Sequence, residues 1–229
     1  NCMKNKIILG LAAAGTALAM LPLLAAFEAH VVNVTATIEN ALKLETKDIS
    51  FGTTFPEEVF DLPLVLALSQ SFLDEKRVDD VEYVIRQKPK CWNNDPQNPV
   101  FGVVTEEDEE FVCVNPDFEI LPLLCPFLSK HPDITPTPGN DESLDAFHGP
   151  ITNWTPADTI DNEVEGVLSK VGLDTIDSWK IDLHVPCFEG SCAQDNVIAP
   201  EYQLDPELEH SLFGCDLWVE TTGISLSEF

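Results

Sequence analysis

The chain has 229 residues, 44% of them hydrophobic, and its 40 Asp and Glu residues outnumber its 12 Lys and Arg residues. This length and apolar content suffice for a packed core, which argues against a wholly disordered chain. The formal net charge of −28 argues against nucleic acid as a partner, because nucleic-acid binding requires a basic surface. An excess of carboxylates suits a soluble secreted protein, and also a protein that binds divalent cations such as calcium.

The N-terminus has the layout of a secretory signal peptide. Two lysines precede an uncharged apolar run that ends in small residues, as in exported proteins. We expect residues 1–26 to be the signal, with signal peptidase cutting after Ala26 and leaving Phe27 as the new N-terminus. The run is also long enough to span a membrane. An uncleaved anchor is therefore the alternative, although Pro22 would break its helix.

Alternation of apolar and polar residues predicts β-strands along the remaining chain. The first covers residues 30–40, where Val32, Val34, Ala36 and Ile38 share one face. Proline-rich and Asx-rich segments separate it from later strands. Those strands are predicted at residues 49–55, 62–72, 80–91, 178–188 and 213–226. The alternation predicts a core-facing side for Val81, Tyr83, Ile85, Trp179, Ile181, Leu183 and Val185.

One helix is predicted over residues 154–172. Thr155 suits the N-cap, Pro156 the first helical position, and Asp158 completes a capping-box pattern. Gly172 is placed to end the helix. The apolar stripe of this helix is predicted to contain Ile160, Val164, Val167, Leu168 and Val171.

The pattern of elements predicts a mainly β fold. We expect residues 27–229 to form a single antiparallel, jelly-roll-like β-sandwich. One or two helices are inserted, since residues 204–213 also have a weak helical pattern. Residues 91–192 are expected to hold the loop and helix elaborations, with disulfides in the long loops.

Six cysteines follow the apolar run. An even number after an export signal indicates three disulfides. Zinc is the alternative, but the closest pair, Cys187 and Cys192, has a wider spacing than the C-x-x-C that zinc sites use. The pairing is not readable from sequence; we favour Cys187–Cys192 and Cys91–Cys113. The six predicted disulfide cysteines are Cys91, Cys113, Cys125, Cys187, Cys192 and Cys215.

The sequence offers no pattern for catalysis or cofactor binding. The histidines form no His-Glu-x-x-His motif, no Gly-x-Ser-x-Gly elbow is present, and no glycine loop suits a phosphate. We therefore predict a protein that is not an enzyme and has no cofactor apart from a candidate calcium ion. The acidic stretch 105–111 lacks EF-hand spacing, and a solvated loop is its alternative reading. Its weak calcium candidates are Glu106, Glu107, Asp108, Glu109 and Glu110.

The signal ends in "LLAAF" and is followed at once by an alternating strand. With these two features, the opening of the chain resembles the TasA/camelysin family of secreted bacterial proteins. Residues 38–72 also resemble the family's order of strand, turn rich in Pro, Gly and acids, and buried strand. The segment "FGCDLWVETTGIS" is similar to the returning strand of the same sandwich. The resemblance covers residues 3–88 and the last strand.

This resemblance implies a jelly-roll-like protein, secreted to the extracellular space or cell surface, whose copies assemble into biofilm-matrix fibres. In such fibres the N-terminal strand of one subunit completes the sheet of the next. A strand freed by cleavage can add to a sheet edge, and head-to-tail addition produces filaments because it does not close. The predicted self-assembly strand contains Val32, Val34, Ala36 and Ile38.

Two alternatives to self-assembly stay open. In one alternative, the segment that contains these four residues is an ordinary strand of its own domain. In the second, the protein is a monomeric or membrane-anchored cell-surface module that binds calcium or a glycan. The expected partners are copies of the chain itself and, during export, signal peptidase, with no nucleic acid.

Overall fold

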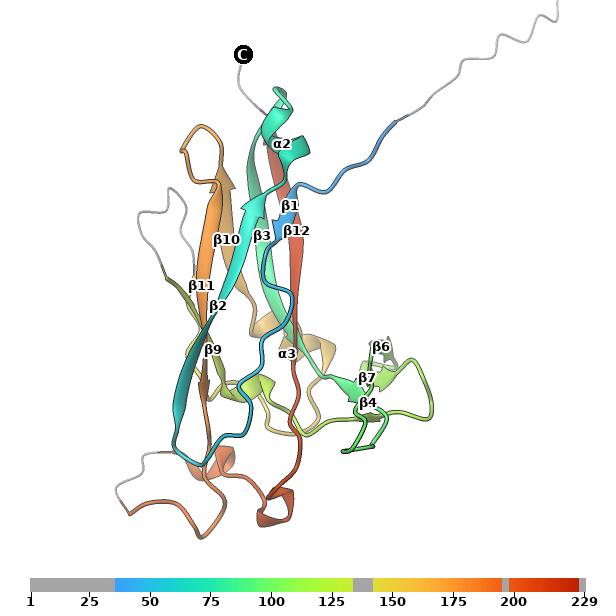
Figure 1. Ribbon diagram of the computed structural model, residues 1–229, viewed down its shortest axis with the longest axis vertical. Helices are drawn as coiled ribbons and strands as arrows, with labels where there is room; N and C mark the ends of the chain where they lie inside the picture. The colour runs from blue at the N-terminus through green and yellow to red at the C-terminus, as the bar shows by residue number, and fades with distance from the viewer. Residues whose placement is uncertain (1–35, 134–141, 195–197, 227–229) are drawn as a thin grey trace, which may run out of the picture. The chain divides into compact units, whose positions relative to one another are not determined.

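The computed structural model describes residues 36–133, 142–194 and 198–226 (Figure 1). Residues Glu39–Phe229 form one compact unit, and Asn1–Ile38 form a separate one of which only 36–38 are described. The described chain is mainly β, as predicted, with two short α-helices. Within the described residues, neither helix is long and apolar enough to cross a membrane. The helices are α2 (Gln70–Asp74) and α3 (Pro156–Asp161).

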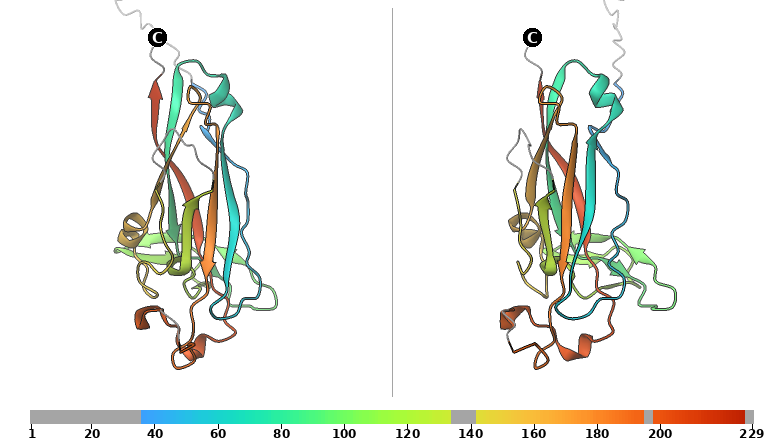
Figure 2. Two further views of the ribbon diagram at one scale, coloured as in Figure 1. Left: turned by 90° about the vertical axis from the view of Figure 1, so that its left-hand side faces the viewer. Right: turned by 60° about the vertical axis from the view of Figure 1, so that its left-hand side comes forward.

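Two antiparallel sheets, here called sheet A and sheet B, are stacked face to face (Figure 2). From β2 onwards, the strands of the two sheets alternate along the chain: β2, β9 and β11 belong to sheet A, and β3, β10 and β12 belong to sheet B. This establishes an antiparallel sandwich; the jelly-roll connectivity stays a prediction. In order across the sheet, sheet A contains β1 (Leu42–Leu44), β2 (Val59–Leu68), β11 (Ile176–His184) and β9 (Leu128–Pro132). Sheet B contains β10 (Val164–Ser169), β3 (Val78–Lys88) and β12 (Asp216–Leu226).

The connection between β3 and β9 carries two small sheets. Their strands are β4 (Cys91–Trp92), β5 (Phe101–Gly102), β6 (Val104–Glu107), β7 (Glu110–Cys113) and β8 (Glu119–Ile120). Strands β6 and β7 form a separate hairpin, while β4 pairs with both β5 and β8. Three 3₁₀ turns complete the elements: η1 (Cys125–Phe127), η2 (Pro200–Tyr202) and η3 (Pro206–Leu208).

The core lies between sheets A and B, where the predicted alternation is confirmed. Val81, Tyr83 and Ile85 of β3 are fully buried, and so are Trp179 and Ile181 of β11. A hydrogen-bond chain ties the sheets together, because the indole Nε1 of Trp179 donates to the Tyr83 hydroxyl at 2.8 Å, and that hydroxyl donates to the Asp177 carboxylate. The pairing satisfies polar atoms that would otherwise be costly to bury.

Glycine at position 166 of β10 leaves room for the Tyr83 ring. A Cβ atom on Gly166 would lie 2.4 Å from Cζ of the Tyr83 ring, which it faces across the β10–β3 ladder. The missing side chain thus makes room for the residue that links the two sheets.

The prediction for residues 49–72 is partly wrong. Residues 49–55 form no strand, since Gly52 turns the chain at φ +70°, although Ile49 and Phe51 still pack on the core. Strand β2 begins earlier than predicted and ends at Leu68. The chain then enters α2, because Ser69 caps it by accepting a hydrogen bond from the Phe72 amide at 3.2 Å.

The helix predicted over residues 154–172 is right at its start and wrong beyond Asp161. Thr155 and Asp158 form the capping box, but residues 164–169 are strand β10. A spacing of four residues fits both a helical turn and two strand repeats, so Val164 and Leu168 could not distinguish them. Pairing with β3 decides for the strand. The second predicted helix is also wrong, since only η3 is helical there.

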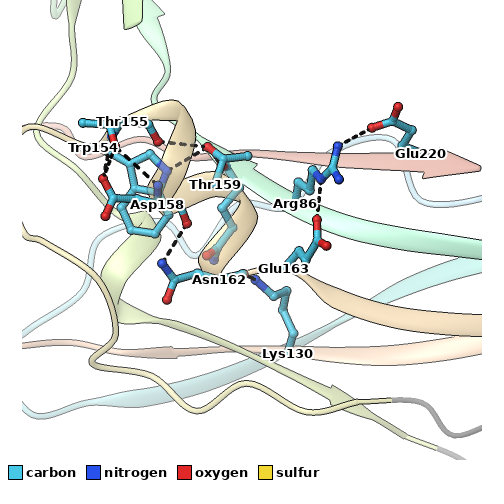
Figure 3. A network of polar contacts seen from close by, with 10 residues as sticks. Arg86, Lys130, Trp154, Thr155, Asp158, Thr159, Asn162, Glu163 and Glu220 are labelled. Carbon is cyan, nitrogen blue, oxygen red and sulfur yellow. Dashed lines mark hydrogen bonds and ion pairs between the residues drawn. The ribbon is translucent and has the colours of Figure 1, made fainter. Parts of the chain in front are cut away.

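A polar network fixes α3 against the sheets (Figure 3). Thr159 of α3 accepts from the indole of Trp154 at 3.1 Å and donates to the Gln87 carbonyl at 2.9 Å. Arg86 of β3 lies between Glu163 and Glu220, with N–O distances of 2.5 and 2.6 Å. The network therefore joins α3, β3 and β12.

Lys130 of β9 is fully buried at the end of α3. Its Nζ donates to the main-chain carbonyl of Asn162, the C-cap of α3, at 2.9 Å (Figure 3). Burial lowers the pKa of this amine to about 7, and the nearby Glu163 carboxylate opposes that shift. A neutral amine is thus within reach at physiological pH.

Candidate self-assembly surface

The predicted self-assembly strand lies at the margin of the described chain. Val32 and Val34 lie outside the described residues. Ala36 and Ile38 are described, but residues 36–40 form no strand in the single chain, which contradicts that part of the strand prediction. Ile38 is 94% exposed. Alternation of apolar and polar residues is thus not sufficient to produce a strand at residues 36–40.

All six predicted cysteines form disulfides. Both favoured pairs, Cys91–Cys113 and Cys187–Cys192, are present, and the third joins Cys125 to Cys215. Three disulfides are typical of proteins that fold in an oxidising, extracellular-type environment. The Cys125–Cys215 bridge closes a loop of 90 residues and attaches the residue just before β12 to the turn before β9.

The five calcium candidates lie on the β6–β7 hairpin. Glu107 pairs with Glu110 across the ladder, while Glu106 pairs with Phe111 on the other face. Asp108 and Glu109 form the tip, both with positive φ. Because the side chains alternate between faces, the five carboxylates do not converge. In the ranges that the structure describes, no group of three His, Cys, Asp or Glu residues is arranged to hold a metal ion.

Three of the sandwich's strand edges are partly covered by the chain itself. At β9, Leu144 exchanges two main-chain hydrogen bonds with Lys130. At β10, the amide of Glu142 donates to the Glu165 carbonyl at 3.1 Å. At β2, three-residue β1 pairs with the last residues, and the Thr46 hydroxyl bonds to the main chain of Val65. Covering and shortening are the usual protections of edge strands.

The β12 edge is different. This strand has 11 residues and pairs with β3 on one side. For the part of the chain that the structure describes, no main-chain hydrogen bond reaches β12 from the other side. An edge of this length offers a row of unpaired donors and acceptors to another strand. Sequence reasoning missed this feature, because no local pattern tells which strand ends at an edge.

The two halves of β12 differ in chemistry. In the first half, Leu217 and Val219 pack on the core, and Asp216 and Glu220 form ion pairs on the outer face with Lys90 and Arg86. The second half, residues 221–226, contains no charged residue. Its apolar side chains are exposed, Ile224 at 50% and Leu226 at 75%. Another strand can therefore pair with this half without burying a charge.

Comparison of the chain with protein-family models, with curated proteins and with solved structures finds no match. The geometry of the molecule is therefore the basis for inferring its function, above all the edge of β12 with which no described segment pairs.

Proposed function

We propose that the protein is a secreted, non-enzymatic structural protein whose copies assemble into extracellular fibres, of the kind found in a biofilm matrix. The N-terminal strand of one copy adds to the β12 edge of the next. The open edge of β12 is the observation that carries this proposal, because the other edges of sheets A and B are at least partly paired with segments of their own chain, whereas no described segment pairs with the outer side of β12.

The proposed donor and acceptor segments match in chemistry. Residues 31–38 contain no charged side chain in a protein of net charge −28, and neither do residues 221–226 of β12. Pairing two uncharged segments avoids the repulsion that most other surfaces of this protein would create. Signal cleavage after Ala26 would free the donor segment, whereas an uncleaved anchor would tether it.

Strand addition must supply more free energy than association costs. Val32, Val34 and Ile38 would each contribute roughly 1.5–3 kcal/mol if fully buried. Association itself costs about 4–15 kcal/mol in lost freedom of motion. Together the three side chains would supply roughly 4.5–9 kcal/mol, less than the upper part of that range, so the main-chain hydrogen bonds along β12 must add to the affinity.

Fibre formation is tested by electron microscopy and analytical ultracentrifugation of the secreted protein. Mass spectrometry first establishes whether the mature chain begins at Phe27. We expect fibres from the intact chain and monomers after deletion of residues 27–38. A chain that stays monomeric, with a size that the deletion does not change, would refute the proposal. In that case, calorimetry with calcium and a glycan panel would test the surface-binding alternative.

The position of the donor strand is tested by cross-linking. A photoreactive amino acid replaces Val34, and irradiated fibres are digested and analysed by mass spectrometry. We expect cross-links to β12 of another molecule. The same probe at Phe55, which is 65% exposed in the loop before β2, is the control and should not mark β12.

A further inference from the structure

The turn between β10 and β11 exposes two large apolar side chains. Val171 is 79% exposed and Leu173 is 87% exposed, and the paired residues Ser169 and Asp174 close the turn behind them. A single exposed apolar residue is ordinary. Two at the tip of one turn, where Gly, Asn, Asp and Ser are usual, call for a physical reason.

Leu173 also has an unfavourable backbone conformation. Its φ is +58°, in the left-handed region that disfavours residues with a Cβ atom, and Gly or Asn would fit better. Leu173 is thus apolar where polar residues are usual, and has a backbone conformation that its Cβ atom disfavours. An exposed residue with both properties is typical of a functional contact. Leu173 therefore lowers the stability of the single chain, and a contact with another molecule would offset that loss.

An apolar pocket of about 490 Å³ lies beside segment 204–213. Leu121, Leu123 and Trp154 line it and are buried, whereas the lining carboxylates of Glu110 and Asp205 are exposed. Its volume is within the range of ordinary ligand pockets, roughly 300–1,000 Å³. The pocket therefore combines an apolar floor with an acidic rim.

The turn and the segment that helps to line the pocket lie at opposite ends of the sandwich. Figures 1 and 2 show the β10–β11 turn at one end and residues 198–213 at the other. The tip therefore cannot fill the pocket of its own molecule, and only a second copy could bring the apolar tip and the apolar pocket together.

We propose that the β10–β11 tip of one copy inserts Val171 and Leu173 into the apolar pocket of a second copy. The inference rests on the proposed self-assembly, to which it adds a second contact surface. The tip and pocket are different surfaces, so the contact repeats from molecule to molecule without closing, as a filament requires. The inserted residues 171–173 are uncharged, whereas the nearest acids, Asp174 and Asp79, lie at the base of the turn, where Asp79 accepts a hydrogen bond from the Val171 amide at 3.0 Å.

The tip contact is too small to hold two copies together without the strand-addition contact. A tip of three residues buries much less than the roughly 1,200–2,000 Å² of a stable interface. Joined to strand addition between the same copies, it becomes effectively intramolecular and raises the overall affinity without being strong alone. We expect it to set how fast and how far fibres grow.

The first test is Leu173→Asn in the full secreted chain. Asn suits the positive φ, so thermal stability should be unchanged or higher, while the critical concentration for assembly should rise at least tenfold. Phe55→Asn is the matched control at another exposed apolar residue, and should change assembly less than twofold. Unchanged assembly by Leu173→Asn would overturn the inference.

Charge reversal at the rim identifies the pocket. Leu173→Lys should impair assembly less than Leu173→Glu, because Glu110 and Asp205 attract lysine and repel glutamate. Adding Glu110→Lys should remove most of that difference, because the new positive charge offsets the negative charge of Asp205. A difference that Glu110→Lys leaves unchanged would place the partner surface elsewhere and overturn the inference.

Two further outcomes separate the proposals. If deletion of residues 27–38 abolishes fibres and Leu173→Asn does not affect them, the tip contact is wrong and strand addition stands. If Leu173→Asn abolishes binding to anionic lipid vesicles and leaves assembly intact, the tip's partner is a membrane and the inference is again overturned.

Discussion

Replacement of Lys130 by methionine should stabilise the protein below neutral pH. The Lys130 side chain is fully buried, and its pKa is about 7 in the folded chain against 10.5 in the unfolded chain. Each pKa unit corresponds to about 1.4 kcal/mol. Keeping this amine charged in the fold below pH 7 therefore costs about 5 kcal/mol.

The cost has a definite dependence on pH. Between pH 7 and 10.5 the folded chain binds fewer protons at Lys130 than the unfolded chain does, so the contribution of this residue to the free energy of unfolding becomes less unfavourable as pH rises. Lys130→Met removes the charge but leaves the Asn162 carbonyl without its donor, at a cost of about 1–3 kcal/mol. The variant should therefore be more stable by about 2–4 kcal/mol at pH 6, and about equal to the wild type at pH 9.

Guanidinium denaturation of both proteins at pH 6, 7.5 and 9 measures this difference. Lys180→Met on the neighbouring strand β11 is the control, because that lysine's side chain is 47% exposed and its replacement should give no comparable pH dependence. If the stability difference between Lys130→Met and wild type is the same at pH 6 and pH 9, Lys130 does not titrate in this range and the reasoning from its burial is wrong.

Three other changes probe the fold. Burial lowers the pKa of His148 to about 4, so between pH 6.5 and 4 the folded chain binds fewer protons at this residue than the unfolded chain does. The free energy of unfolding should therefore fall by up to about 3 kcal/mol over this range. His148→Gln should remove this part of the pH dependence. Replacing both Cys125 and Cys215 by alanine opens a 90-residue loop and should cost about 4–5 kcal/mol in a urea titration, provided that the reduced chain has no residual structure. Gly166→Ala places a Cβ against the Tyr83 ring and should cost about 1–3 kcal/mol, with a change in Trp179 fluorescence as its hydrogen bond to Tyr83 is disturbed.

Local sequence patterns predicted correctly the features whose signal lies in composition or within a few neighbouring residues. The alternation in β3 and β11 placed Tyr83 and Trp179 in the core correctly, because a sandwich strand with one buried face has a period of two. Thr155 and Asp158 marked a helix start correctly, because a capping box is complete within four residues. The even cysteine count likewise indicated three disulfides.

Errors arose where a pattern fitted two structures. Val164 and Leu168 suit a helix or a strand, and only the ladder with β3 makes β10 a strand. Residues 49–55 alternate like a strand but have no partner strand, and Gly52 bends them away from extended geometry. In both places, pairing between distant segments overrode local preference.

The sequence by itself determined the mainly β class, the faces of the central strands, the participation of all six cysteines and the excess of negative charge, because each depends on composition or on neighbours a few residues apart. Only the tertiary structure decided that β12 ends a sheet, that Lys130 is buried against α3, and that Cys125 meets Cys215. These facts depend on which distant segments pack together, since an edge, a buried amine or a pocket exists only relative to the rest of the fold.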